Sequence, residues 1–545
     1  MAAQDNGPDL SQAKELKPVG FTGNLWAQSG FYDVSGIPAR SNNFIWSLGG
    51  NASLNLYESV SLPFSFTVGQ YGNSVHRPTF GQFGISPRYK SLTVHLGHRN
   101  LNFSPYTLAG HTFLGAAVEL RPGLFRFAAM SGRLRKAQET QPNLISIPPT
   151  FRRTAFGGKI GIGTQDHFID LIVLKGKDDP ASLPNPEQAQ ITPAENLVLG
   201  VSSKLQLAKQ LGFYLDFAVS AFTRDQNSKL YEGSRLSLDN FIPSGIFTSR
   251  YSSRANLAGK TGLRYTGTNF QMGLEYERID PEYETMGSFF FLNDVQNILL
   301  TPAIRLGGGM VNLNGSLGFQ RNNLLNNRSE TSHRFIGNGT LSYSNPGKPF
   351  GFALNYTNFT ITQADGRFEL SDTIRLSMVT TNVNLSPYWN WVSASATKSL
   401  VFSANYQELN DRNTFTREFT DMTTLFFNGT YSLFLLEPGW GVNAGGNYNQ
   451  VNVFNLDTER YGVSTGLNKQ FFANKLNLAL NGTYNLTRIN NERDGSTWSL
   501  NLTSGLSASQ KLHFSLYTNV LKNNSAQFDD YLEWMGGAQL NLVLR

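Results

Sequence analysis

Apolar and small polar residues alternate along the chain from about residue 19 to the C-terminal end. In one clear segment every second position holds Leu476, Leu478, Leu480, Gly482, Tyr484 or Leu486, and the gaps hold Asn, Ala and Thr. The same alternation recurs at 498–506, 512–516 and 534–544. A period of two predicts β-strands with one apolar and one polar face.

The length of these segments indicates a membrane protein. Each runs for about 10–15 residues. Strands of soluble proteins average about 5–6 residues, whereas tilted strands that span a bilayer need about 9–11. A soluble all-β array such as a propeller would have shorter strands, with charged residues at the outward positions. We therefore expect strands that span a membrane.

The connections between the segments alternate in length. Short links occur at 121–123, 163–166, 267–269, 307–309, 345–348, 437–439 and 473–475. Longer links lie between them, at 34–42, 73–81, 137–151, 178–193, 225–254, 282–294, 323–332, 364–374 and 524–531. Short periplasmic turns and long extracellular loops are typical of a transmembrane β-barrel.

The sequence thus predicts an all-β fold, a single transmembrane antiparallel β-barrel of about 26 strands (range 22–26), an even number as in bacterial outer-membrane barrels. The first strand is expected at Phe21–Tyr32 and the last at Leu532–Arg545, with both termini periplasmic. Residues 1–18 form a periplasmic N-terminal extension in this interpretation, and residues 19–545 form the barrel. Such a barrel would have a circumference of about 160 Å and a diameter of about 50 Å.

Composition explains why other classes of protein fit poorly. Only 15% of the 545 residues are charged, while glycine accounts for 52 residues and aromatics for 12%. A soluble enzyme carries about 25% charged residues, and this many aromatics would not stay solvated in a disordered chain. No run approaches the roughly 18 apolar residues that a transmembrane helix needs. The mean hydropathy of −0.28 agrees with strands that are apolar on one face only.

Charge and cysteine content narrow the chemistry further. The net charge of +6 is scattered along the chain, and nucleic-acid binding needs a concentrated basic stripe, so we expect no nucleic-acid partner. The absence of cysteine removes disulfides, thiolate metal sites and cysteine nucleophiles. Residues 1–8 carry no signal-peptide pattern, so either the chain is cytosolic or an export signal has been removed or replaced.

The inward side chains of its wall cannot fill the lumen of a barrel this wide. The long links at 137–151, 178–193, 225–254 and 282–294 lie in the first half and could fold inward as a constriction. The apolar run that ends in Phe289, Phe290 and Phe291 suits a loop packed either in the lumen or on a partner protein. Trp389 and Trp391, in a link on the periplasmic side, fit an interfacial aromatic girdle or a docking site for a periplasmic partner.

Strand parity places several charged or polar residues in the lumen. The expected lumen-lining residues are His95, Arg99, His111, Glu119, Lys159, Asp170, Lys260, Arg264, Glu275 and Glu277. They could form a solute path or binding site, or a ladder of ion pairs on a wet wall. His95 and His98 have opposite parity and cannot ligate one metal from a regular strand, so we expect no metal site and no cofactor.

One motif resembles that of a serine nucleophile. Gly462-Val463-Ser464-Thr465-Gly466 fits the pattern G-x-S-x-G, which needs a sharp strand-to-helix turn to expose the serine. Here the motif lies within a strand segment, so no catalytic residue is expected. An outer-membrane enzyme that modifies lipid through Ser464 remains a distant alternative.

Two blocks of sequence carry a family resemblance. The stretches Phe83–Lys90, His95–Arg99 and Phe103–Gly115, and later Glu277–Gly287, resemble a family of large outer-membrane β-barrel proteins of Bacteroidota. The resemblance implies the outer membrane of a Gram-negative bacterium, surrounded by outer-membrane lipid and lipopolysaccharide. It implies no settled activity, so no functional residues are transferred from it.

Two functions remain open at this point. The first is a non-enzymatic conduit or scaffold within a larger secretion, surface-protein or barrel-assembly complex of the cell envelope, with protein partners. The second is a porin-like diffusion channel for a polar solute, gated by the loops of the first half. A wide barrel without its own plug domain favours the first.

Overall fold

The computed structural model describes residues 18–56, 60–70, 81–139, 149–184, 191–231, 246–288, 292–526 and 529–544. The predicted N-terminal extension therefore lies almost wholly outside the described residues. The first strands are β1 (Val19–Ser35), β2 (Phe44–Leu56), β3 (Val60–Gln70), β4 (Gly81–Ile85), β5 (Arg88–Tyr89), β6 (Leu92–Asn100), β7 (Thr112–Leu120), β8 (Phe125–Arg135), β9 (Arg153–Gly163), β10 (Phe168–Asp178), β11 (Glu195–Ala208), β12 (Leu211–Thr223), β13 (Ser253–Thr266) and β14 (Phe270–Ile279).

The remaining strands are longer on average, and most have 14–16 residues. They are β15 (Val295–Leu306), β16 (Val311–Asn322), β17 (Glu330–Ser344), β18 (Phe350–Asp365), β19 (Ser377–Val392), β20 (Ala396–Asp411), β21 (Met422–Leu435), β22 (Trp440–Val453), β23 (Leu456–Phe471), β24 (Leu476–Ile489), β25 (Glu492–Ser507), β26 (Leu512–Ser525) and β27 (Tyr531–Leu544). In the part of the chain that the structure describes, three single turns of helix lie between strands: η2 (Pro180–Ser182), η3 (Gly307–Gly309) and α1 (Arg417–Thr420).

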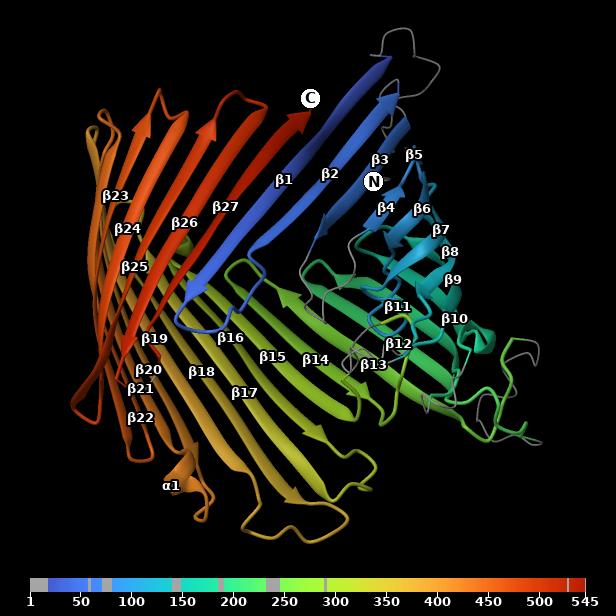
Figure 1. The fold of residues 1–545 in the computed structure, drawn as a ribbon. Coiled ribbons are helices and arrows are strands. Elements are labelled where there is room, and N and C mark those ends of the chain that lie inside the picture. Colours follow the sequence, from blue (N-terminus) through green and yellow to red (C-terminus); the bar gives the residue numbers. More distant parts are fainter. Residues whose placement is uncertain are drawn as a thin grey trace.

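The strands form one antiparallel sheet that closes on itself (Figure 1). β1 pairs with β2 along one edge and with β27 along the other, so the last strand meets the first. β4 and β5 both lie between β3 and β6 and continue one another across Ser86 and Pro87. A proline has no N–H to donate to a ladder, which accounts for a break at this point. The described residues therefore form a 26-stranded barrel, as predicted.

The two rims of the barrel differ in their connections. The rim that carries the turns 121–124, 267–269 and 393–395 also carries the start of β1 and the end of β27, and we call it the short-turn rim. It lies at the top of Figure 1, and the opposite, long-loop rim carries α1 at the bottom. The predicted alternation fails at β22–β23 and at β24–β25, where the links at the long-loop rim are only two residues each, Phe454 with Asn455 and Asn490 with Asn491. The three asparagines have positive φ, of 54°, 50° and 66°, and asparagine tolerates this conformation in tight hairpins.

The outward face of the wall is apolar and ends in aromatic side chains. On β23 the outward positions include Tyr461, Val463 and Leu467, which are 40%, 62% and 49% exposed. Toward the short-turn rim, the ring of Trp389 lies 5.1 Å from that of Phe350. Trp389 and Trp391 lie within β19, so the prediction that they occupy a link was wrong. Their outward positions suit an aromatic girdle, and the exposed apolar band suits a transmembrane barrel. Among the described residues, no helix is long and apolar enough to cross a bilayer.

Candidate functional site

Two loops at the long-loop rim turn into the lumen and form hydrogen bonds with each other. The backbone N–H of Ala109 donates to the carbonyl oxygen of Gly287 at 2.9 Å. The Thr285 hydroxyl donates to the carbonyl oxygen of Thr107 at 2.9 Å, and the Tyr283 hydroxyl donates to that of Tyr106 at 2.6 Å. We call residues 101–111 and 280–288, which join β6 to β7 and β14 toward β15, the inner wedge.

The inner wedge packs against the lumen side of the wall. Met286 and Leu108 are 2% and 0% exposed and share a hydrophobic cluster with Leu174 and Val198, which occupy inward positions of β10 and β11. The cluster also contains small residues at inward positions, namely Ala117, Ala128, Ala155, Ala218 and Ala258. Small side chains leave room for the loops, so the wall and the inner wedge together form a dry core inside the barrel.

The position of Met286 shows where part of the apolar loop 282–294 lies. Met286 lies in the lumen, and its N–H donates to the Oδ1 atom of Asn196 at 3.0 Å. Of the two alternatives, packing in the lumen is therefore correct for this part of the loop. Phe289, Phe290 and Phe291 lie outside the described residues.

The described part of loop 225–254 does not follow the prediction of an inward fold. Phe247 is 5% exposed and packs with Leu197 and Ala221, which occupy outward positions of β11 and β12. Nearby, the Nζ atom of Lys175 lies 3.0 Å from a carboxylate oxygen of Glu195, and both are also outward. This loop segment therefore covers the outside of the wall near the long-loop rim.

A buried ion-pair cluster surrounds Asp170 on the lumen side of β8–β10. Arg126 donates to both carboxylate oxygens of Asp170, at 2.7 and 2.9 Å. The Nζ atom of Lys159 lies 3.7 Å from the same carboxylate, and the Asp170 side chain is only 1% exposed. Two cations and one anion fixed in this way form a structural brace.

A second cluster links the inner wedge to β12–β15. The Tyr106 hydroxyl donates to Glu277 at 2.6 Å, and the amide of Asn297 donates to the other oxygen of Glu277 at 2.7 Å. On the next inward position of β14, Glu275 accepts from the Tyr214 hydroxyl and lies 3.7 Å from the Nζ atom of Lys260. Glu277 therefore anchors the loop, and Glu275 braces the wall beneath it.

The other predicted lumen residues do not join these clusters. Arg99 donates to the Ser65 hydroxyl at 2.9 Å, and Nδ1 of His95 lies 2.8 Å from the Ser86 hydroxyl. Glu119 pairs with Arg121 at 3.3 Å. Arg264 lies at an inward position of β13, opposite Gly273. His111 precedes β7 and is 5% exposed. The ten residues are thus spread over several groups, which fits the ion-pair ladder better than one solute site.

Burial shifts the pKa of two groups in the inner wedge. Desolvation raises the pKa of the Tyr106 hydroxyl, and the hydrogen bond to Glu277 raises it further. Desolvation lowers the pKa of the His111 imidazole, so His111 is neutral at pH 7. The described residues hold no cluster of side chains that could bind a metal ion.

Several residues of these clusters were not predicted to line the lumen. Arg126 lies between the outward Phe125 and Phe127, so strand parity could have found it. Tyr106 lies on a loop, where parity carries no information, and its partner Glu277 is 171 residues away along the chain. No signal in a single sequence brings those two residues together.

Replacing Tyr106 with phenylalanine should loosen the inner wedge. The hydroxyl donates to a charged acceptor, and losing such a bond costs about 1.5–3 kcal/mol. We expect faster hydrogen exchange at the Ala109 amide, which closes the contact between the two loops. Tyr484→Phe, on the outward face of β24, is the control and should leave that exchange rate unchanged. Equal rates in wild type and Tyr106→Phe would contradict an anchoring role.

The opposite wall of the lumen is mainly polar, with charged residues such as Arg334, Asp411 and Arg460 at inward positions of β17, β20 and β23. On β19, β21 and β24, of which every residue is described, no inward position carries a charge. Asn447 and Asn485 of β22 and β24 lie on either side of Gly462. Ser464 is opposite Gly445 and Thr483 in the middle of β23, without the turn that a nucleophile elbow needs. The inward positions of these strands thus carry mainly amide and hydroxyl groups.

Comparisons with known proteins give a fold likeness only. The sequence matches no known protein family and no curated protein sequence. Among solved structures, the P pilus usher (PapC) translocation pore covers 96% of this chain and 99% of its own, with 12% identity and a TM-score of 0.40. OccK9 (OpdG) and OprD of Pseudomonas aeruginosa each cover 65% of this chain and 92% and 91% of their own, with 12% and 13% identity and TM-scores of 0.31 and 0.30. The strand register of the chain itself establishes that it is a large, closed β-barrel.

Proposed function

We propose that this protein is an outer-membrane barrel of a Gram-negative bacterium that acts, without enzymatic activity, as a conduit or scaffold in a cell-envelope complex. The short-turn rim would face the periplasm and the long-loop rim the cell surface, as in other outer-membrane barrels. Lipid and lipopolysaccharide would surround the apolar outward band. Its partners in the complex would be other proteins of the envelope.

One observation carries this proposal: the filling of the lumen is one-sided. All members of the large inner hydrophobic cluster lie between Leu101 and Val295. No described residue from β16 to β27 belongs to it. With a diameter of about 50 Å for 26 strands, an inner wedge on one wall leaves a broad path beside the other. That width exceeds what a small solute needs and suits a bulky client or a partner chain.

The chemistry of the uncovered wall supports a polymer as client. Asn, Ser and Thr side chains on β19, β21 and β24 can exchange hydrogen bonds with a passing chain one at a time. These three strands carry no fixed charge at their inward positions, so they hold no ionic group strongly. A polypeptide or a neutral polysaccharide would therefore slide along these strands rather than bind to them.

Purification from native membranes in mild detergent tests the proposal. We expect at least one other chain to co-purify in fixed proportion through affinity and size-exclusion steps, because a conduit this wide needs an occupant or a cover. An unrelated porin tagged and purified from the same membranes is the control for chance association. Recovery of this protein alone, at the mass of one chain in its detergent micelle, would contradict the proposal.

A porin-like channel for a polar solute is the second candidate. The inner wedge favours it, because loops 101–111 and 280–288 narrow the lumen from one side, and charged side chains gather beneath them on β8–β14. In this case the isolated barrel would conduct ions in a planar bilayer, and displacing the inner wedge would increase the current. A silent barrel with and without an intact inner wedge would exclude this candidate.

A further inference from the structure

The mainly polar wall opposite the inner wedge carries one row of apolar side chains on its lumen side. The row crosses β17–β23 through residues that face each other in the strand register, and Thr380 is its one polar member. We call its apolar members the apolar stripe. They are Ile336, Phe359, Leu409, Met422, Val453 and Leu456.

The loops next to the apolar stripe leave it uncovered. Ile336, Phe359 and Leu456 are 41%, 39% and 43% exposed, and none of the six residues is buried. Every link at the long-loop rim between β16 and β25 is described, namely 323–329, 366–376, 412–421, 454–455 and 490–491. The apolar stripe therefore differs from the opposite wall, where the inner wedge covers the inward apolar residues.

The outward face of the same strands is polar at this level. The adjacent outward row lies one residue closer to the short-turn rim and consists of Asn358, Thr381, Glu408, Thr423, Asn452 and Asp457. Nearer the membrane the apolar side chains of these strands point outward, toward lipid. At the apolar stripe they point inward, so the apolar face of the wall has changed sides.

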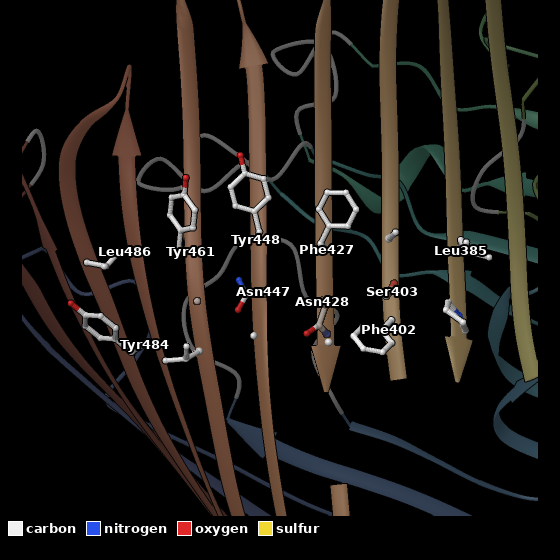
Figure 2. Close-up of a pocket in the computed structure, with 16 residues that line it drawn as sticks. Leu385, Phe402, Ser403, Phe427, Asn428, Asn447, Tyr448, Tyr461, Tyr484 and Leu486 are labelled. Carbon is white, nitrogen blue, oxygen red and sulfur yellow. The ribbon is translucent and has the colours of Figure 1, made fainter. Parts of the chain in front are cut away.

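Tyrosines mark the level at which this change takes place. Tyr356, Tyr406, Tyr448 and Tyr461 occupy outward positions two to four residues closer to the short-turn rim. Figure 2 shows the rings of Tyr448 and Tyr461 at one level, with both hydroxyls pointing toward the long-loop end of β22. Such belts of tyrosine lie at the membrane–water interface.

The wall continues beyond this belt. β17–β23 have 14–16 residues each, whereas about 9–11 are enough to cross a bilayer. The apolar stripe therefore lines the mouth of the barrel above the membrane, where both faces of the wall meet water. Apolar side chains in such a place favour a bound occupant, because covering them removes apolar surface from water.

A guanidinium without a carboxylate partner lies near each end of the apolar stripe. Arg334 is the next inward residue beside Ile336 on β17, and Arg460 lies four residues after Leu456 on β23. The residues that face them across the ladders are uncharged, namely Gln320, Ile361, Asn449 and Thr487. The Nε atom of each arginine is buried and has no hydrogen-bond partner among the described residues.

We infer that the apolar stripe binds an apolar face of a partner protein that enters the mouth from the cell-surface side. Acidic side chains of the partner would pair with Arg334 and Arg460. Six strand spacings of about 4.8 Å separate β17 from β23, so the stripe is about 29 Å long. An α-helix of about 20 residues spans this length. An apolar centre with charged groups at its edge is also typical of protein interfaces.

The chemistry of the apolar stripe selects a protein over the other occupants. A lipid carries its charge at the headgroup alone and cannot match guanidiniums at both ends of the stripe. A neutral polysaccharide offers neither a carboxylate nor an extended apolar face. The inference rests on the proposed function, because it specifies one partner of the cell-envelope complex and the surface that this partner contacts.

Photo-crosslinking in native membranes tests the inference, with p-benzoylphenylalanine in place of Phe359. Tyr356 is the matched control position, because it lies three residues away on the outward face of the same strand. We expect the Phe359 position to form an adduct with one other polypeptide, attached through an apolar segment that contains Asp or Glu. The Tyr356 position should not form this adduct.

The two guanidiniums have their own arm of the experiment. Arg334→Glu combined with Arg460→Glu should lower the yield of the Phe359 adduct about tenfold. Arg334→Lys combined with Arg460→Lys is the matched control and should retain most of the adduct, because lysine keeps the positive charge. The mobility of the unheated proteins in SDS gels shows whether both variants form the barrel.

Several results would overturn the inference. An adduct with lipid or with another segment of this chain would assign the apolar stripe to a different occupant. Equal adduct yields from the Glu and Lys variants would remove the acidic partner. A chain that co-purifies without an adduct at Phe359 would overturn the inference and leave the proposed function standing. If no chain co-purifies and no adduct forms, both fail.

Discussion

Asp170→Asn is expected to destabilise the folded barrel by about 3–5 kcal/mol, the usual cost of removing one partner from a buried ion pair. The carboxylate of Asp170 is 1% exposed and is shared by Arg126 and Lys159, whose side chains are 10% and 11% exposed. Asparagine would leave both cations buried without a counter-charge. Nothing else in the described surroundings of Asp170 carries a negative charge within ion-pair distance of these two cations.

Urea unfolding in detergent, followed by tryptophan fluorescence and by the mobility of the unheated protein in SDS gels, would measure the loss. Asp166→Asn is the matched control, because Asp166 is 84% exposed and pairs with Lys204 at 2.7 Å on the surface. An exposed pair of this kind contributes about 0–1 kcal/mol. If both variants unfold at the same urea concentration, the cluster around Asp170 is not a brace.

Strand parity predicted the barrel because outward and inward positions meet different solvents. Leu476, Leu478 and Leu480 form an outward-facing row on β24, as predicted. The same reasoning placed Lys260, Glu275 and Glu277 on the lumen side. Parity depends on a continuous pleat. It therefore could not foresee the break at Pro87 between β4 and β5, or the two-residue turn at Asn490 and Asn491, where backbone conformation decides.

The surfaces against which the loops pack could not be predicted from the sequence. The segment 101–111 contains Leu108, Phe103 and Tyr106, whose burial depends on a second segment almost two hundred residues later. Likewise, Phe247 covers the outer wall rather than the lumen, although both locations bury an apolar side chain equally well. Hydrophobicity indicates that such a loop is covered, but the surface that covers it is set by tertiary contacts.

A hollow on the outward face, whose lining includes Phe427, Gly429, Gly446 and Tyr448, could be predicted in part from the sequence. Gly429 and Gly446 occupy outward positions two residues from the large outward residues Phe427 and Tyr448. A glycine at such a position marks either a close backbone approach or an indentation. The register that brings Gly429 opposite Gly446 was needed to decide for the indentation.

Gly287→Val should release the inner wedge and increase the conductance of the barrel. A Cβ atom at Gly287 would lie 2.2 Å from the carbonyl oxygen of Thr107 and 2.6 Å from a methyl group of Leu174. Backbone atoms cannot yield by the more than 1 Å that this contact requires, so loop 280–288 must move away from loop 101–111. The hydrogen bonds of Ala109 and Thr107 to this loop are then lost. Each such bond contributes about 0.5–1.5 kcal/mol to stability.

Single-channel recording in a planar bilayer would measure the effect, with Gly505→Val as control. Gly505 lies at an inward position of β25, where an added Cβ atom meets nothing within 4 Å, so the control adds the same side chain to the lumen without a clash. Because the inner wedge covers one wall only, its release should widen the path without unfolding the barrel, and the unheated gel mobility should stay that of wild type. A Gly287→Val current equal to that of wild type would mean that the inner wedge does not restrict the lumen. The path would then be limited by the residues of the opposite wall or by a partner chain.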